Sequence, residues 1–319
     1  MTERPAPIPI IAGPTAGGKA RLAMEVARRA GATILSCDSM KVYRHMEIGT
    51  AKPSAAARAA CDWRGLDLVD PEQDFDTARW VEEAERQIAS ARSERRPILV
   101  SGGTALYIKG LTEGLFAGPG RDDALRAELR EEARQRGLAE LHAELAGVDA
   151  ASATAIHPND ERRIIRALEV YRKTGRPISE LQRQFDDPEA PSRRALFFVR
   201  RARDEMDARI NERVDRMMAA GWAEECEALL DRPGELSRGP LQAIGYRQLF
   251  DVIERRRAGE APDLAEVVTT IKTRTRRFAR RQLTWLKHFP DARLVELSGD
   301  ELPEALVAEL VAAVEATVG

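Results

Sequence analysis

The feature that most restricts the fold of this chain is a glycine-rich turn that joins an apolar run to a helical segment. The apolar run, residues 8–12, is typical of a short buried strand, and residues 19–30 have the pattern of a helix. The turn between them reads Gly-Pro-Thr-Ala-Gly-Gly-Lys, residues 13–19. In such a turn, backbone N–H groups, the positive end of the helix and the lysine together bind a cluster of anionic oxygens. The pattern therefore predicts a phosphate-binding loop, or P-loop.

The same turn departs from the P-loop pattern at one position. Gly13, Gly18 and Lys19 satisfy the spacing G-x-x-x-x-G-K, but the next residue is Ala20, where a Ser or Thr hydroxyl normally binds Mg²⁺. We expect the loop to hold a phosphate or diphosphate, with weakened metal binding. Its expected anion-binding residues are Gly13, Pro14, Thr15, Ala16, Gly17, Gly18, Lys19 and Ala20.

The composition favours a helix-rich globular protein and excludes several other classes. Charged residues make up 32% and aromatic residues 5% of the 319 residues, and the net charge is −2. A near-neutral chain has no global basic field, although local arginine clusters are compatible with nucleic-acid binding. Three widely spaced cysteines argue against a disulfide framework or a zinc site. No apolar run is long enough to span a membrane, and we expect a monomeric, cytoplasmic protein.

Strand and helix patterns alternate in the first part of the chain. Strands are expected at residues 8–12, 33–37, 66–69 and 97–100, and helices at 19–30 and 77–93. Such alternation predicts an α/β fold with a parallel sheet and helices on both faces. Ligands of such sheets bind at the carboxyl ends of the strands.

A change in composition divides the chain into a core and an insertion. After Gly118-Pro119-Gly120 the sequence is almost purely helical as far as Thr174, and the apolar run 196–199 is typical of a strand that rejoins the sheet. We therefore expect a P-loop core at residues 1–117 and 193–319 and an inserted all-helical subdomain at 118–192. The remainder, from Asp204 onwards, is again mostly helical.

Polar residues follow the expected strands of the core. Asp38 comes directly after the strand 33–37, and Gly102-Gly103-Thr104 after the strand 97–100, while the loop 48–53 adds a further hydroxyl and cation. Because the carboxyl ends of parallel strands meet at one edge, we expect these residues to share one cleft with the P-loop. A carboxylate at Asp38 could bind Mg²⁺, accept a substrate proton or cap the next helix, and the residues leave these alternatives open.

Taken together, these motifs resemble those of the tRNA dimethylallyltransferase, or isopentenyltransferase, family. The family's hallmark runs stand in this chain, in order, at residues 13–19, 38–43, 49–53, 102–107, 156–160, 163–170, 244–248 and 281–287. The resemblance thus extends from the first strand to about Lys287. It implies a P-loop fold of the kind found in nucleotide-binding proteins, carrying an inserted helical subdomain.

The resemblance implies transfer of a dimethylallyl group from dimethylallyl diphosphate to RNA. The acceptor would be the exocyclic amine of the adenosine 3′ of the anticodon, in tRNAs that read codons beginning with U. Lys19 would stabilise the charge that develops on the departing diphosphate, which Thr15 and Arg213 would also contact. Asp38 would be the general base, and Thr104 would bind the flipped adenine. The expected catalytic residues are thus Asp38, Thr104 and Arg213, and the expected cofactor is Mg²⁺.

The resemblance also implies a set of tRNA contacts. The expected RNA-binding residues are Asp38, Ser39, Met40, Lys41, Thr104, Arg126, Arg162, Arg163, Arg166, Arg247, Arg281 and Gln282. Those in the helical insertion would clamp the anticodon stem-loop. For Arg163 and Arg166 an alternative remains open, namely pairing within their own helix with Glu161 and Glu169.

Three other functions are compatible with parts of the sequence. A small-molecule P-loop kinase would explain the loop and the sheet, but it needs good Mg²⁺ ligation, against which Ala20 argues. A non-catalytic RNA-binding relative would explain the altered loop, but Lys19, Asp38 and Arg213 are intact. An adenylate isopentenyltransferase would use free AMP, whereas the helical insertion and the late basic runs favour a large RNA acceptor.

The alanine in the P-loop yields a first prediction. Restoring the hydroxyl with Ala20→Thr should lower the Mg²⁺ concentration needed for half-maximal activity, because a protein ligand is returned to the metal. The measurement is a Mg²⁺ titration of prenyl transfer by both proteins. Identical Mg²⁺ dependence in the two would contradict the expected weakening of metal binding.

Overall fold

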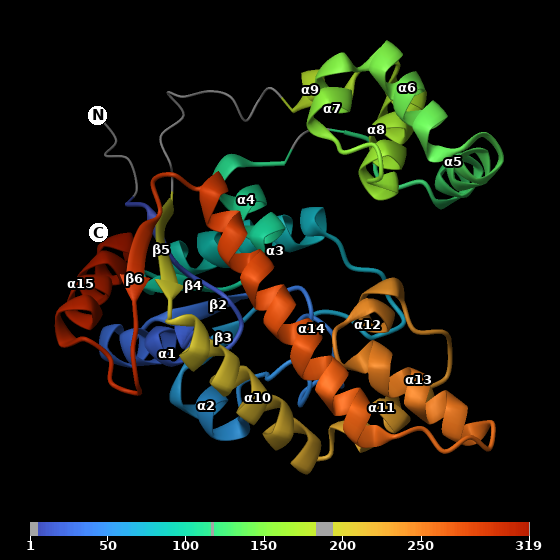
Figure 1. Cartoon of the computed structure of the whole chain (residues 1–319). Coiled ribbons are helices and arrows are strands. Elements are labelled where there is room, and N and C mark those ends of the chain that lie inside the picture. The colour runs from blue at the N-terminus through green and yellow to red at the C-terminus, as the bar shows by residue number, and fades with distance from the viewer. Residues whose placement is uncertain (1–5, 116–117, 183–193, 319) are drawn as a thin grey trace, which may run out of the picture. The chain divides into compact units, whose positions relative to one another are not determined.

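The computed structural model describes residues 6–115, 118–182 and 194–318 (Figure 1). The chain forms two compact units, which we describe separately. The first unit comprises residues 1–112 and 192–319, and the second comprises residues 113–191. Among the described residues, no helix is both long and apolar enough to cross a membrane.

The first unit is built on a six-stranded sheet in its described part. The strands are β1 (Ile8–Ala12), β2 (Thr33–Cys37), β3 (Asp62–Arg64), β4 (Ile98–Gly102), β5 (Arg194–Arg200) and β6 (Arg293–Glu296). Their order is β3-β2-β4-β1-β5-β6, and every neighbouring pair is parallel. The predicted α/β fold with a parallel, helix-flanked sheet is therefore confirmed.

Alternate residues of the strands enter separate cores on the two faces of the sheet. In β1, Ile11 packs with α1 (Lys19–Ala30) and α15 (Glu304–Glu315), whereas Ile10 faces α3 (Thr77–Ser93) and α4 (Ala105–Glu113). Every residue of β1, β2 and β4 is buried. Burial on both faces explains why these strands are continuous apolar runs.

One of the remaining helices of the first unit lies between β2 and β3, and the others lie between β5 and β6. They are α2 (Ala55–Ala60), α10 (Arg203–Ala219), α11 (Trp222–Leu230), α12 (Arg238–Gln242), α13 (Tyr246–Arg257) and α14 (Leu264–Thr284), with short 3₁₀ turns η2 (Trp285–His288) and η3 (Ala316–Val318). Helix α10 packs against α14, and α11 against α13 (Figure 1). These helices add the walls of the site described below.

The second unit is a small helical body with a core of its own. Its helices are α5 (Asp123–Arg136), α6 (Leu138–Val148), α7 (Ala150–Ala155), α8 (Glu161–Thr174) and α9 (Ile178–Leu181). Leu129, Leu141, Leu145 and Leu168 lie at the centre of its core. Carboxylate caps begin three of its helices: the side chains of Asp122, Asp149 and Asp160 accept backbone N–H groups at the starts of α5, α7 and α8.

Two strand predictions differ from the structure. The strand expected at residues 66–69 is wrong, because β3 lies at Asp62–Arg64 and Asp67 takes a left-handed turn with φ of 54°. The side chain of Asp67 instead accepts hydrogen bonds from Lys52 and Arg58. Strand β6 was not predicted, since Val295 alone of its four residues is buried and the segment has no strand-like alternation.

Candidate active site

The carboxyl ends of β1, β2 and β4 open into one cleft of about 590 Å³. Lys19 follows β1, Asp38 follows β2 and Thr104 follows β4, and all three line the cleft. Strand β4 lies between β2 and β1, so these three loops are neighbours. The prediction that the polar loops at the strand ends share one cleft is therefore confirmed.

The P-loop has the wound backbone that an anion site requires. Gly18 caps α1 with φ of 95°, a conformation natural to glycine, and Ala16 is held in the left-handed region with φ of 61°. The Lys19 ammonium donates a hydrogen bond to the carbonyl of Pro14 at 3.1 Å. The lysine is thus folded over the turn, and the N-terminus of the 12-residue helix α1 begins beside it.

Gln282 of α14 ties the P-loop to the loop after β4. Its Oε1 accepts the backbone N–H of Thr15 at 2.8 Å, and its Nε2 donates to the carbonyl of Gly103 at 2.8 Å. The side chain is buried, so both ends of the amide are used within the protein. Gln282 therefore positions the anion loop, while the RNA contact expected for it stays a prediction.

Three cations interact with Asp38, the only carboxylate among the described residues that line the cleft. Burial lowers the pKa of Lys19 to about 8, and the negative charge of Asp38 only partly opposes this effect. Burial also lowers the pKa of Lys41 and of Arg213, again against the charge of Asp38. Three poorly hydrated cations near one carboxylate leave a net positive field, which an anionic ligand would neutralise.

Asp38 and Thr104 are each fixed by a contact with the chain between β2 and the next turn. The Oδ1 of Asp38 accepts the backbone N–H of Met40 at 2.9 Å, and its Oδ2 accepts no hydrogen bond from the described residues. The Thr104 hydroxyl accepts the backbone N–H of Ser39 at 3.0 Å. The expected acceptor-binding residues Asp38, Ser39, Met40, Lys41 and Thr104 all line the cleft.

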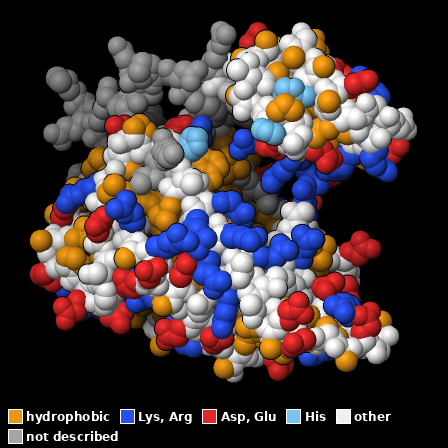
Figure 2. All heavy atoms as spheres, in the orientation of Figure 1, with side chains coloured by type: hydrophobic (Ala, Val, Ile, Leu, Met, Phe, Trp, Pro, Cys, Tyr) orange, Lys and Arg blue, Asp and Glu red, His pale blue; other side chains and the backbone are white. Residues whose placement is uncertain are grey.

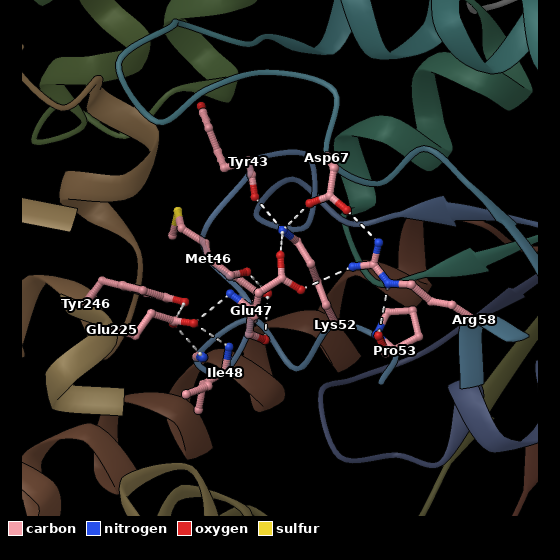
Figure 3. A network of polar contacts seen from close by, with 12 residues as sticks. Tyr43, Met46, Glu47, Ile48, Lys52, Pro53, Arg58, Asp67, Glu225 and Tyr246 are labelled. Atoms are coloured by element: carbon pink, nitrogen blue, oxygen red, sulfur yellow. Dashed lines mark hydrogen bonds and ion pairs between the residues drawn. The ribbon is translucent and has the colours of Figure 1, made fainter. Parts of the chain in front are cut away.

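Residues 49–51 line the cleft, and a carboxylate from α11 holds their loop, residues 46–53, in place (Figure 3). Glu225 accepts the backbone N–H groups of Glu47, Ile48 and Gly49 at 2.8, 2.7 and 3.3 Å. The Tyr246 hydroxyl donates to the same carboxylate at 2.6 Å. The loop is thus a braced wall rather than a free segment.

The hydroxyl and the cation of this loop serve the loop itself. Thr50 donates to the carbonyl of Met46, and the buried Lys52 ammonium donates to the carbonyl of Tyr43 and to Glu47 and Asp67 (Figure 3). Burial disfavours the charged form of Asp67, but hydrogen bonds from Lys52 and Arg58 outweigh it and lower the pKa of this carboxyl. Neither Thr50 nor Lys52 is therefore available to a ligand through these groups.

Helix α14 carries two rows of cations with different surroundings. Lys272, Arg276 and Arg280 face α10, where they bind Asp215, Asn211 and Asp207. In the described part of the chain, the side chains of Arg274, Arg277 and Arg281 have no hydrogen bond or ion pair, and all three are exposed. We call these three the free row of α14.

The free row borders a hollow next to the cleft. Together with Ile244 and three threonines of α14, it lines a pocket of about 380 Å³. Arg281 also lines the cleft that holds Asp38, and so does the exposed ring of Phe278. Figure 2 shows Lys and Arg side chains gathered on this face of the first unit, over α14. Unneutralised arginines beside hydroxyl donors are typical of a surface that binds phosphates.

In the helical unit, two of the four predicted arginines are engaged in its interior. Arg126 and Arg166 both bind the fully buried carboxylate of Glu169, at 2.8 and 2.6 Å. This is the pairing left open for Arg166, and two guanidinium groups on one carboxylate still leave a net positive charge. Arg162 and Arg163 are exposed on α8, and Arg163 makes a 3.5 Å pair with Asp160 rather than with Glu161.

The structure adds residues that sequence reasoning did not select. Arg274 and Arg277 belong to a basic run whose two faces could not be told apart without knowing which face packs on α10. The apolar residues Ile210, Val214 and Met217 of α10 line the cleft, as does Trp222. Their spacing is that of any buried helix face, so nothing in the sequence distinguishes a cleft wall from a core.

The fold and the site together define a P-loop protein. Its anion loop opens into a cleft that contains the Asp38 carboxylate and is bordered by the free row of α14. A family model described as "IPP transferase" matches residues 41–289, and a second, described as "Isopentenyl transferase", matches residues 6–61. The chain belongs to the IPP transferase family. This membership confirms the resemblance inferred from the motifs.

Known relatives extend over nearly the whole chain. The chain is 44% identical to a tRNA dimethylallyltransferase of Geobacter sulfurreducens, over 90% of this chain and 91% of the relative. It is 43% identical to one of Syntrophobacter fumaroxidans, over 90% and 82%. Among solved structures, a tRNA isopentenylpyrophosphate transferase of Bacillus halodurans matches with a TM-score of 0.69 and 30% identity, over 98% of this chain and 97% of that one.

The lowered pKa of Lys19 yields a prediction for the pH dependence of anion binding. A bound diphosphate favours the protonated lysine, so affinity should be full below pH 8 and fall, by up to about tenfold per pH unit, as the free protein loses this proton above pH 8. Calorimetric titration with dimethylallyl diphosphate between pH 6.5 and 9.5 measures this. Lys19→Arg keeps its charge throughout that range and should remove the decline. An unchanged decline in this variant would assign it to another group.

Proposed function

We propose that this protein transfers the dimethylallyl group of dimethylallyl diphosphate to the exocyclic amine of the adenosine 3′ of the anticodon. The tRNAs would be those that read codons beginning with U, and the product would be isopentenyladenosine. The observation that carries the proposal is that the anion loop and the Asp38 carboxylate share one cleft, which the free row of α14 borders. A donor whose diphosphate leaves as an anion would use the anion loop. An acceptor amine carried on RNA would use the carboxylate and the basic surface.

The donor half of the reaction would take place at the P-loop. The allylic C–O bond breaks, its electron pair leaves with the diphosphate, and carbocation character develops on the prenyl group. Lys19, the loop N–H groups and Arg213 would stabilise the charge that builds on the leaving group. Burial lowers the pKa of Lys19 and Arg213, so their charged forms gain most when an anion develops beside them.

The acceptor half would use Asp38 and Thr104. The amine nitrogen forms a bond with the allylic carbon, and its proton passes to the Asp38 carboxylate as that bond forms. An aromatic amine is a weak nucleophile, so its orientation against the allylic carbon matters as much as the base. The adenine would have to leave its stack to enter the cleft, and Thr104 would meet it there.

Mg²⁺ is part of the proposal through a limited set of protein ligands. Within the described residues, no group of three or more His, Cys, Asp and Glu side chains could hold a metal. Mg²⁺ commonly uses one or two carboxylates, substrate phosphates and waters. Asp38, at the edge of the P-loop, fits that donor set. When bound, Mg²⁺ would neutralise charge on the diphosphate.

The RNA would be held by the free row of α14, with further contacts from Arg247 and from Arg162 and Arg163 of the helical unit. All of these side chains are exposed. The adjacency of the free row to the cleft supports this, because phosphates that flank a flipped nucleotide must lie near the cleft that receives it.

The direct test is transfer of labelled dimethylallyl from its diphosphate to an anticodon stem-loop RNA with an adenosine 3′ of the anticodon. Asp38→Asn keeps the acceptor for the Met40 N–H but loses the base, so turnover should fall by about 10²–10⁴-fold. Asp62→Asn makes the same change on β3, outside the cleft, and should retain activity. Wild-type protein that binds the RNA without labelling it would indicate a non-catalytic relative.

The free row of α14 yields a separate prediction. Arg277→Ala should raise the KM for the stem-loop several-fold and reduce the salt slope of binding by about 0.7–1, with kcat unchanged, because it removes a phosphate contact remote from the chemistry. Lys272→Ala is the matched control on the same helix, where the cation already pairs with Asp215. Equal effects of the two substitutions would show that the two rows do not differ in function.

A further inference from the structure

The apolar end of the cleft is formed by one stripe of helix α10. Ile210, Val214 and Met217 are spaced four and three residues apart, so they lie on one face of the helix, and all three are buried and line the cleft. Arg213 belongs to the same face and lines the cleft too. The group proposed to hold the diphosphate therefore lies within this apolar stripe, with Val214 and Met217 on its C-terminal side.

Trp222 is a further apolar wall of the cleft and is locked in place. A Cβ on Gly49 would lie 2.0 Å from the indole Nε1, and a Cβ on Gly245 would lie 1.9 Å from Cη2 of the same ring. Only glycines fit at these two positions. The ring also meets Tyr246 edge-on, with centroids 5.6 Å apart. Clamped between two backbones, Trp222 is a rigid wall that cannot give way to a longer ligand.

The neighbouring part of the wall is thin. An outer groove of about 840 Å³ lies along the loop 47–58 and the C-terminal part of α10. The groove and the cleft share three lining residues, which are Ala51, Arg213 and Met217. Of these three, Ala51 is small and Arg213 is assigned to the diphosphate, so Met217 is the large apolar side chain of the partition.

We propose that Met217 sets the longest prenyl donor that the cleft accepts, by separating it from the outer groove. The inference rests on the proposed function. Arg213 and Met217 are one helical turn apart, which is about 6 Å along the axis of α10. A chain anchored by its diphosphate near Arg213 therefore reaches Met217 after a short prenyl unit. A five-carbon chain ends in front of this side chain, whereas a ten-carbon chain has to pass it.

Loss of the Met217 side chain would join the two spaces. The outer groove offers apolar surface to a longer chain through Ile48, Pro53 and Ala220. Met218, the next residue on α10, lines neither space, although it also packs against the core. The chain thus supplies a matched control that has the same side chain on the same helix.

The experiment is a competition between dimethylallyl and geranyl diphosphate for one anticodon stem-loop RNA. Mass spectrometry distinguishes and quantifies the two products. Their ratio reports relative kcat/KM and does not depend on how much of each preparation is folded. Wild-type protein should give almost only the five-carbon product. Met217→Ala should raise the proportion of the ten-carbon product at least tenfold, with a smaller rise for Met217→Val. Met218→Ala should leave the ratio unchanged.

Three results would overturn the length-stop proposal. An unchanged ratio in both Met217 variants would place the length limit elsewhere in the cleft. An equal rise in Met218→Ala would show that loosening of α10, rather than the partition, controls length. Wild-type protein that modifies no RNA with either donor would remove the proposed function itself, whereas the first two results leave that function intact.

Discussion

The site depends on one buried amide. Gln282 joins the backbone of the P-loop, 267 residues away in sequence, to the loop after β4, 179 residues away. Each hydrogen bond contributes only about 0.5–1.5 kcal/mol to stability. Their positional effect is larger, because the same helix that fixes the anion loop also carries the free row of arginines. Helix α14 thereby couples the place where an anion is held to the place where phosphates of a nucleic acid can be met.

Electrostatics and packing shape different parts of the cleft lining. At the P-loop, burial lowers the pKa of Lys19, Lys41 and Arg213, and the charge of one carboxylate opposes this effect only in part. Such an arrangement is costly in the empty protein and becomes favourable once an anion enters. Elsewhere in the cleft, α10 and Trp222 present apolar walls, and Glu225 braces the adjoining loop 46–53. One cleft thus combines a site for a leaving anion with a site for a hydrocarbon chain.

Much of the fold could be predicted because its strands are buried on both faces and therefore stand out as apolar runs. Helices α1 and α3 lie at the predicted residues because each is bounded by clear turn or capping residues. Strand β6 and the true place of β3 could not be predicted, because edge strands bury few residues and depend on their neighbours. The motifs identified Asp38 and Thr104 as candidates, but their spacing could not show which polar groups were already engaged.

The sequence by itself determined the P-loop, the parallel sheet and the family, since these follow from local patterns of glycine, lysine and apolar residues. Only the tertiary structure decided how side chains of the same type divide between roles. Lys52 is buried among acceptors, whereas Lys19 lines the cleft; Arg276 binds α10, whereas Arg277 faces outwards. The physical reason is that the partners of a charged side chain decide whether it remains available to a ligand. Partners distant in sequence are brought together only when the helices pack.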